Sequence, residues 1–449
     1  MRLQEFFQKF ALSEGNQVSV LTKKQQILEG TLIPSNDEGI LALKLKNGYN
    51  AGIKVEEVSE IKKISEGKTV GKPPVKEIQK DSKKPTIAIL HTGGTIASRV
   101  DYATGAVYAS FNEKDLLTMF PELSQKANIV SEHLSNMWSD DMRFAHYAKM
   151  AKAIEKHASS GVAGIIIGHG TDTLGYSAAA LAFMLEGLNI PVLLVGAQRS
   201  SDRGSSDAAM NLECAAEFIL NSDFAGVAVC MHDSSSDSKC AILPACKMRK
   251  LHSSRRDAFK AVNDTPIALV DYNSKKIDFL KENFERKSSK KKLVVKEKME
   301  DKVAILKVHT NMSPEQVRFF EKQEYKGLVI EGTGLGQMPG FIPDDSAMGN
   351  KGIIEAVESL TKSGCVVVMT TQCIFGRVQM HVYDKGVKLI KVGVIPGEDM
   401  LAETAFVKLA WLLGQYPKSP EKVKELMVKN LRGEITERTN FDEDFAKEL

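Results

Sequence analysis

The stretch TIAILHTGG (residues 86–94) joins a short apolar run to a Gly-rich polar end. Stretches of the same design recur further along the chain: GVAGIIIGHG (161–170), IPVLLVGAQ (190–198), FAGVAVCMH (224–232), YKGLVIEGTG (325–334) and GCVVVMTTQ (364–372). Each is typical of a buried strand that ends in a turn. Helical spacing lies between them, as in RFAHYAKMAKAIEKHAS (143–159), so the pattern predicts an α/β fold with parallel-rich sheets. Ligands of such folds bind beyond the carboxyl ends of the strands, where we therefore expect the chemistry.

The chain divides into segments that differ in composition and in hydrophobic pattern. Residues 1–70 hold short stretches of alternating Val, Ile and Leu between turn residues, which predicts a small antiparallel β-barrel domain. Residues 71–84 are rich in Pro, Gly and Lys and are interpreted as a linker. A charged linker at 286–302 then separates two α/β domains, 85–285 with the candidate motifs and 303–449 with a helical tail.

Composition limits the class of protein. Of the 449 residues, 43% are hydrophobic and 26% charged, which excludes wholesale disorder. A net charge of +3, from 60 basic and 57 acidic side chains, is too balanced for a chain that binds nucleic acid along its whole surface. The six cysteines include no CxxC pair, so reduced thiols and a cytoplasmic location are expected. No HExxH motif occurs, and no metal site is predicted.

The first motif is HTGGTIA (91–97), directly after a predicted strand. Its two glycines let the backbone turn sharply and approach a ligand, and the hydroxyl of Thr95 follows at once. An ordinary strand-to-loop turn remains an alternative. A phosphate loop does not, because no Gly-Lys-Ser/Thr follows.

The second motif is GHGTDT (168–173), at the end of another predicted strand. A hydroxyl beside a carboxylate, as in Thr171 and Asp172, suits proton handling, although the same residues favour a helix N-cap. Both roles can coexist. The third segment, CKMRKLHSS (246–254), would by default be a solvated face, and a lysine there acts as a base only where its pKa is lowered by burial.

Together TGGTIA and HGTDT resemble the asparaginase and glutaminase family, over about residues 85–431. The resemblance implies an amidohydrolase with Thr95 as the nucleophile that forms an acyl-enzyme. Thr171, Asp172 and Lys250 would activate the attacking group and the later water. His91 and His169, which lie inside the two motifs, are interpreted as structural residues or as residues that support the site from behind.

The same resemblance implies the residues that bind the substrate. Ser135 fits the position that holds the α-carboxylate and α-amino group of the substrate. Tyr102 would be the tyrosine of a lid. Backbone N–H groups at Gly94 and Gly170 are expected to stabilise the oxyanion.

Two further stretches narrow the resemblance. GTLIPS (30–35) and LKNGYNAGI (45–53) resemble the N-terminal domain of the D subunits of archaeal glutamyl-tRNA(Gln) amidotransferases, and residues 376–413 resemble their C-terminal domain. This implies a glutaminase that hydrolyses glutamine and passes ammonia to an E subunit, which converts Glu-tRNA(Gln) to Gln-tRNA(Gln). Two D and two E subunits would form a heterotetramer around a D homodimer. ATP and Mg²⁺ would bind the E subunit, which would also make most tRNA contacts, and this chain would hold no cofactor.

Two other functions remain open. One is a stand-alone cytoplasmic L-asparaginase, for which the small N-terminal domain has little use. The other is a non-catalytic scaffold that binds RNA. A dinucleotide site at GTGLG (332–336) is discounted, because the segment runs into QMPGFIP and no helix can begin there.

Overall fold

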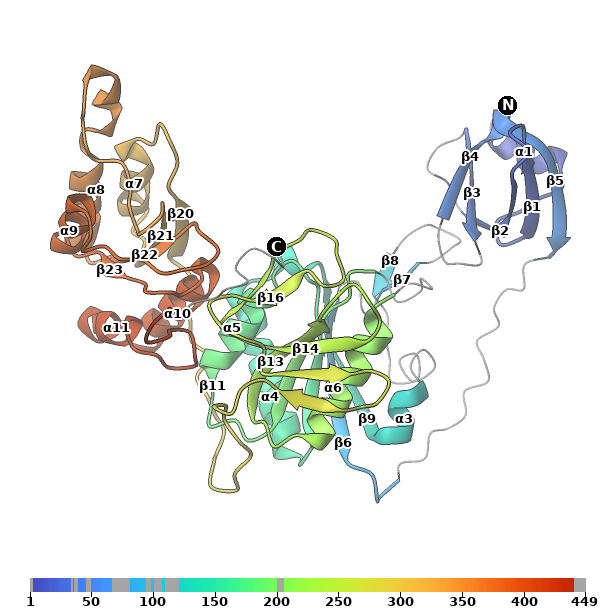
Figure 1. Cartoon of the computed structure of the whole chain (residues 1–449), viewed down its shortest axis with the longest axis horizontal. Helices are drawn as coiled ribbons and strands as arrows, with labels where there is room; N and C mark the ends of the chain where they lie inside the picture. The colour runs from blue at the N-terminus through green and yellow to red at the C-terminus, as the bar shows by residue number, and fades with distance from the viewer. Residues whose placement is uncertain are drawn as a thin grey trace.

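The structure is a computed structural model of the chain, shown in Figure 1. It describes residues 3–33, 35, 39–45, 50–66, 81–93, 98–100, 107–109, 121–199 and 206–439. The predicted fold class is confirmed: an antiparallel N-terminal unit precedes two α/β units with parallel-rich sheets.

The N-terminal unit is a five-stranded antiparallel sheet in the order β4-β3-β2-β1-β5. Its elements are α1 (Leu3–Lys9), β1 (Gln17–Thr22), β2 (Ile27–Ile33), β3 (Ile40–Leu45), β4 (Asn50–Lys54), η1 (Val55–Glu57) and β5 (Val58–Ser65). Alternate residues point to opposite faces of a strand, and the fully buried Val18 and Val20 of β1 meet Leu41 and Leu43 of β3 in one small core. Among the described strands, β4 and β5 form the two edges of this sheet.

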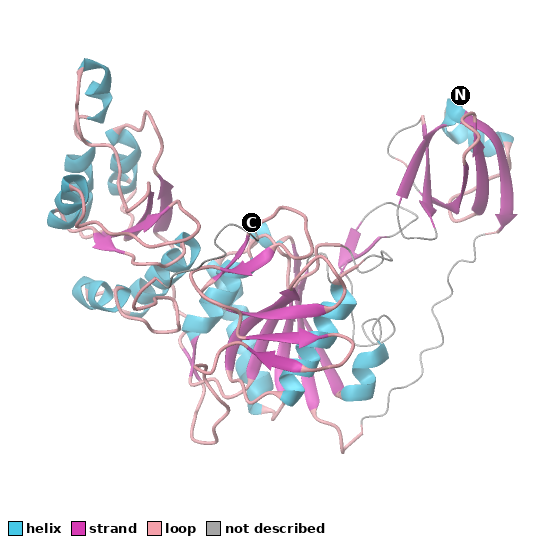
Figure 2. Cartoon of the chain, viewed as in Figure 1, coloured by secondary structure: helices cyan, strands magenta, loops and turns pink. Residues whose placement is uncertain are grey.

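The central unit contains an eight-stranded mixed sheet in the order β18-β17-β14-β13-β12-β10-β6-β9 (Figure 2). The five strands from β13 to β9 are parallel, and β14, β17 and β18 are antiparallel. In chain order the strands are β6 (Thr86–Gly93), β9 (Asn128–Met137), β10 (Gly164–Gly168), β12 (Pro191–Val195), β13 (Gly226–His232), β14 (Lys239–Pro244), β17 (Ala268–Asp271) and β18 (Ile277–Phe279). Two short strands, β7 (Ser98–Val100) and β8 (Val107–Ala109), pair with each other.

Both faces of this sheet are covered by helices. Ile165 and Ile167 of β10 pack with α4 (Phe144–Ser159) and α5 (Leu174–Met184). Ile166, which points to the other face, packs with α3 (Pro121–Lys126) and α6 (Ala208–Asn221). Because parallel strands buried on both faces must be apolar throughout, the continuous Ile run of β10 follows from this arrangement.

The C-terminal unit has a four-stranded parallel sheet in the order β20-β21-β22-β23. Its elements are β20 (Val303–Lys307), α7 (Pro314–Lys322), β21 (Gly327–Gly332), η4 (Asp345–Asn350), α8 (Ile353–Lys362), β22 (Val366–Thr371), α9 (Asp384–Lys391), β23 (Ile395–Pro396), α10 (Ala402–Gln415) and α11 (Pro420–Met427). Helix α7 begins at a capping box of Ser313 and Gln316. One face of the sheet packs with α7, α8 and α9, and the other with α10.

Helix α10 joins the two α/β units into a continuous core. Its Trp411 stacks on Phe183 of α5, with ring centroids 5.6 Å apart, and both side chains belong to a cluster that also includes strands of both sheets. The segment 286–302, which was expected to be a linker, contacts the central unit. Its strand β19 (Val294–Val295) pairs with β11 (Leu185–Glu186) of that unit. Its backbone hydrogen bonds are thus partly supplied by the central unit, and the segment packs against protein.

In the described part of the chain, no helix is long and apolar enough to cross a membrane. The six cysteines are free thiols, and five of them are buried.

Candidate active site

The first motif leaves β6 at Gly93, where only glycine fits. Its φ is +105°, and a Cβ there would lie 2.5 Å from both the backbone N and the backbone O of Met137 on β9. The next residues of the motif, Gly94 and Thr95, and the lid candidate Tyr102 lie outside the described residues.

Hydrogen bonds tie the ends of the neighbouring strands to this turn. The buried Thr92 donates its hydroxyl to the backbone O of Gly168, at 3.0 Å, which joins β6 to β10. Ser135 of β9 donates to the backbone O of Thr92 at 3.3 Å. Ser135 therefore lies beside the first motif, at the carboxyl ends of the strands. Thr92 was not predicted as a structural link, although its place inside the first motif was a visible signal.

The second motif forms the turn between β10 and α5. Thr173 stands at the N-cap position of α5, but its hydroxyl donates to the backbone O of Ser139 at 2.6 Å and makes no cap bond. Gly170 packs so tightly here that a Cβ would lie 2.8 Å from Cβ of Ser139. Threonine at the N-cap is thus used to fasten the turn to a neighbouring segment, while Thr171 stays available for other contacts.

The buried side chain of His169 contacts this turn and the helix that follows it. Its ring is fully buried, with Nδ1 2.6 Å from the backbone O of Gly170 and Nε2 2.8 Å from Oγ of Ser177. A carbonyl can only accept, so Nδ1 carries the proton and Nε2 accepts from the Ser177 hydroxyl. Burial lowers the pKa of His169 to about 4, which keeps the ring neutral. A structural role fits both contacts.

Lys250 reaches the second motif from a separate hairpin. The strands β15 (Met248–Lys250) and β16 (Phe259–Ala261) pair so that Lys250 stands opposite Phe259. Its Nζ lies 3.0 Å from Oγ1 of Thr171 and 2.8 Å from Oδ1 of Asp172. The structure thus brings a predicted amine to a hydroxyl and a carboxylate that lie almost 80 positions away, at separations of 79 and 78 residues. A hydroxyl that touches an amine can exchange a proton with it, and the carboxylate holds the amine in place.

Lys247 corrects the expectation that the basic residues of 246–254 form a solvated face. Its side chain is 0% exposed and its Nζ pairs with the carboxylate of Asp399, which is 1% exposed. No local pattern signals this pair, because the two residues are 152 positions apart. Arg249 is also paired, with Glu403 at 3.0 Å.

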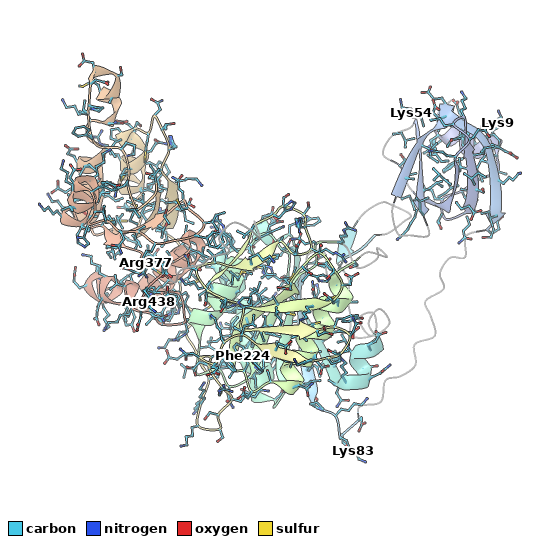
Figure 3. All side chains as sticks on the ribbon, in the orientation of Figure 1. Lys9, Lys54, Lys83, Phe224, Arg377 and Arg438 are labelled. Carbon is cyan, nitrogen blue, oxygen red and sulfur yellow. The ribbon has the colours of Figure 1, made fainter. Side chains whose placement is uncertain are left out.

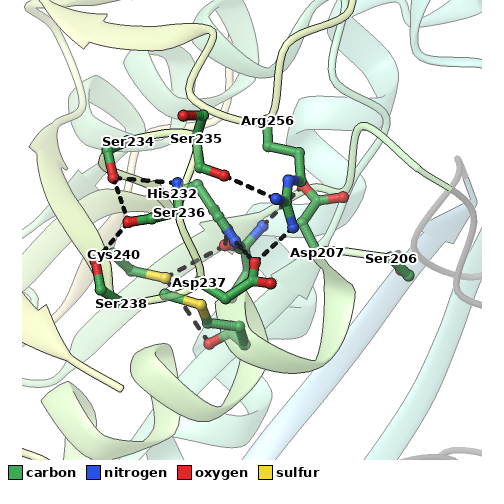
Figure 4. A network of polar contacts seen from close by, with 12 residues as sticks. Ser206, Asp207, His232, Ser234, Ser235, Ser236, Asp237, Ser238, Cys240 and Arg256 are labelled. Carbon is green, nitrogen blue, oxygen red and sulfur yellow. Dashed lines mark hydrogen bonds and ion pairs between the residues drawn. The ribbon is translucent and has the colours of Figure 1, made fainter. Parts of the chain in front are cut away.

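A second polar network orders the ends of β12 and β13 (Figure 4). The buried carboxylate of Asp207 accepts two backbone N–H groups of the loop after β12, each at 3.0 Å. Asn211 donates to Asp207, at 3.3 Å, and its Oδ1 lies 2.7 Å from Nδ1 of His232. Nε2 of His232 lies 3.2 Å from Asp237. These contacts fix the strand ends on one side of the candidate site. Over the described residues, no group of three or more His, Cys, Asp or Glu side chains is placed to hold a metal ion.

Three known families match successive parts of the chain. Residues 86–284 match the family Asparaginase, N-terminal, and residues 302–427 match the Glutaminase/Asparaginase C-terminal domain. Residues 12–64 match the GatD N-terminal domain. The D subunit of the glutamyl-tRNA(Gln) amidotransferase of Pyrococcus horikoshii is 44% identical over 98% of this chain and 99% of its own length. The chain belongs to the family of these D subunits. A member from Methanococcus maripaludis is 44% identical over 92% of the chain and 96% of its own length.

Solved structures support the fold of the two α/β units of this member of the D-subunit family. The thermostable L-asparaginase of Thermococcus kodakarensis matches with a TM-score of 0.68 and 29% identity, over 78% of this chain and 99% of that protein. L-asparaginase I of Vibrio cholerae matches with a TM-score of 0.67 and 28% identity, over 79% and 99%. The asparaginases are covered almost completely, so the matched share of this chain corresponds to a whole asparaginase fold.

Proposed function

We propose that this chain is the glutaminase subunit of a tRNA-dependent amidotransferase. We also propose that the amine of Lys250 is the base that takes up the proton of the nucleophile during amide hydrolysis. The observation that carries the proposal is the position of the lysine amine, 2.8 Å from Asp172 and 3.0 Å from Thr171, at the carboxyl ends of the parallel strands. Ligands of doubly wound sheets bind at this edge. Membership of the D-subunit family, whose relatives are named as amidotransferase subunits, supports glutamine as the proposed substrate.

In the proposed reaction, the hydroxyl of Thr95 attacks the side-chain carbonyl carbon of glutamine. Its proton passes through the hydroxyl of Thr171 to the amine of Lys250, and backbone N–H groups at Gly94 and Gly170 stabilise the oxyanion. The C–N bond then breaks, the proton returns to the leaving nitrogen, and ammonia departs. Water next attacks the ester, loses its proton to the same groups, and releases glutamate.

The substrate would be held by residues around this nucleophile. We assign the α-carboxylate and α-amino group of glutamine to the neighbourhood of Ser135, which lies in the strand next to β6. Tyr102 would close over the bound substrate. Both assignments rest on the family resemblance of the surrounding sequence.

The proposed partner is an E subunit that accepts the ammonia. In this assembly two D and two E subunits form a heterotetramer around a D homodimer, and the E subunit binds ATP, Mg²⁺ and most of the tRNA(Gln). This chain would then need no cofactor of its own. Because such a complex would act where aminoacyl-tRNA is made, we place the protein in the cytoplasm.

The decisive experiment measures ammonia release from glutamine and from asparagine, with and without the E subunit and Glu-tRNA(Gln). We expect glutamine to be the better substrate and the partner with its tRNA to raise the rate. The matched pair Thr95→Ala and Thr95→Ser separates loss of the hydroxyl from loss of the fold: the alanine variant should be inactive and the serine variant partly active. More than about a few per cent of activity in the alanine variant would remove Thr95 from the chemistry, since nucleophile loss costs orders of magnitude.

A stand-alone L-asparaginase is the second candidate, favoured by the structural match to the Thermococcus kodakarensis enzyme. Strong preference for asparagine, unchanged by the partner, would support it over an amidotransferase subunit. Ammonia release from neither amide would leave a non-catalytic scaffold.

A further inference from the structure

The hairpin that carries Lys250 is fastened to the C-terminal unit at its base. β15 begins after Lys247 and β16 ends before Asn263, so these two residues flank the open end of the hairpin. Both residues contact Asp399 of the C-terminal unit, and Asn263 also contacts Gly376. Lys250 itself stands three residues beyond Lys247, in the part of the hairpin that reaches the candidate active site.

Asp399 is the centre of these contacts. Its carboxylate pairs with Nζ of Lys247, and its backbone O accepts from the same Nζ at 3.1 Å. The backbone N of Thr436 donates to the carboxylate at 3.0 Å, and the Thr436 hydroxyl donates to it as well. Arg377, labelled in Figure 3, lies 3.6 Å from the carboxylate and donates to the backbone O of Thr436 at 2.5 Å. Four separate groups therefore hold one buried carboxylate.

Asn263 forms the second attachment. Its Nδ2 donates to the backbone O of Gly376 at 2.9 Å and to the backbone O of Asp399 at 3.1 Å, while its Oδ1 accepts from the backbone N of Gly376 at 2.8 Å. Its φ is +55°, a conformation that asparagine adopts more readily than most residues. Both polar atoms of the Asn263 side chain are thus hydrogen-bonded to the backbone of the C-terminal unit.

We propose that Asp399 is a positioning residue for the reaction: through Lys247 and Asn263 it fixes the β15–β16 hairpin and thereby holds the Lys250 amine against Thr171 and Asp172. The proposal rests on the proposed amidohydrolase function for its kinetic readout. The C-terminal unit then has a part in catalysis although Asp399 does not touch the reacting atoms.

Because the Lys247–Asp399 pair is buried, the charge of Lys247 depends on Asp399. Burial lowers the pKa of Lys247, and the attraction of Asp399 opposes that shift, so the ammonium depends on its partner. Without the carboxylate, the buried Lys247 amine has no charged partner and moves toward water or loses its proton, so the ion pair no longer fixes the start of β15. A displacement of about 1 Å at a catalytic group can lower a rate about 100-fold.

The test uses three variants of the full chain, assayed with the partner and Glu-tRNA(Gln) if these are needed for activity. Asp399→Asn removes the charge with little change in shape. Asn263→Gly removes the amide and keeps a residue that tolerates positive φ. Glu217→Gln is the control, because Glu217 and Lys126 form another largely buried ion pair at 2.8 Å, and the printed partners of the Glu217 carboxylate, Lys126 and Asn221, lie outside the hairpin and outside the contacts of Asp399.

We expect kcat of Asp399→Asn to fall about 10- to 100-fold while KM changes less than about three-fold, as for loss of a correctly placed catalytic group. Asn263→Gly should show a smaller fall in kcat of the same kind. Glu217→Gln should keep kcat within about three-fold at a temperature where all variants are folded. Amide hydrogen exchange of residues 248–261 should rise in the first two variants and not in the control.

Three results would overturn the proposal. They are a folded Asp399→Asn with nearly unchanged kcat, an equal loss of kcat in Glu217→Gln, and unchanged exchange in the hairpin. If Asp399→Asn does not fold, Asn263→Gly decides by the same criteria. Failure of the wild-type chain to release ammonia is a different outcome: it rejects the proposed function, while the exchange measurement still tests the attachment of the hairpin.

Discussion

Lys250 and Lys247 stand three residues apart on one hairpin, and each pairs with an aspartate in opposite surroundings. In the Lys250–Asp172 pair the side chains are 15% and 68% exposed, and in the Lys247–Asp399 pair they are 0% and 1% exposed. Exposed pairs contribute little to stability, whereas breaking a buried pair is costly. The difference indicates that the first pair is kept for chemistry and the second for position. Loss of the Lys250–Asp172 pair should therefore lower activity with little change in stability, whereas loss of the Lys247–Asp399 pair should lower both.

The largest expected effect is on activity, from Lys250→Met. Loss of the amine beside Thr171 should lower ammonia release about 100- to 10,000-fold, the range of a general acid–base group. The melting temperature should change little, because the pair is partly exposed. Lys260→Met is the control on the same hairpin, since Lys260 donates to the backbone O of Asp233 and lies outside the proposed chemistry. Equal activity of the two variants would contradict the role of Lys250.

A change in the turn that carries Thr171 and Asp172 should affect both activity and stability. In Gly170→Ala the new methyl group would meet Cβ of Ser139 at 2.8 Å, so the turn that carries Thr171 must shift. We expect a loss of about 1–3 kcal/mol of unfolding free energy, as for overpacked sites, with a clear fall in kcat. Denaturant unfolding and the ammonia assay measure the two effects. Ser139→Gly in the same chain removes the clash and should restore part of both; no restoration would mean that another contact is responsible.

A change of pH should affect stability alone, through His169. Its folded pKa of about 4 is below the unfolded value of about 6.5, so between these values the unfolded chain binds more protons and stability falls as pH falls. Between about pH 7.5 and about pH 5.0 this histidine should remove about 2 kcal/mol of unfolding free energy. The comparison is with His169→Gln, unfolded by denaturant at both pH values. A wild-type loss on acidification no larger than that of the variant would contradict this assignment.

Much of the fold could be predicted because its determinants are local. The Ile run of β10 and the helical spacing of α4 are each visible within a few residues. The shared core could not be predicted, since Trp411 and Phe183 meet only after the C-terminal unit has folded against α5. The same holds for the pairing of β19 with β11, because β19 lies in a stretch whose composition is that of a charged linker.

Some residues of the candidate site could likewise be predicted from the sequence, and others could not. Thr171 and Asp172 are adjacent and follow a strand, so their place at the sheet edge was predictable, and Lys250 was assigned through the family resemblance. Lys247 and Asp399 were missed, because nothing in a basic stretch tells which lysine turns inward. Burial of a charge depends on a partner from elsewhere in the chain, and a single sequence contains no record of that pairing. Thr95, Gly94 and Tyr102 stay predictions.

The most direct test of the proposed chemistry is the ammonia-release rate of Asp172→Asn, measured beside its melting temperature. Asp172 is the exposed member of the pair that holds the Lys250 amine. We predict a chain that melts within a few degrees of the wild type, roughly the shift of 1 kcal/mol or less, and releases ammonia at least about 100-fold more slowly. Near wild-type release from a chain with an unchanged melting temperature would show that this pair does not drive the hydrolysis.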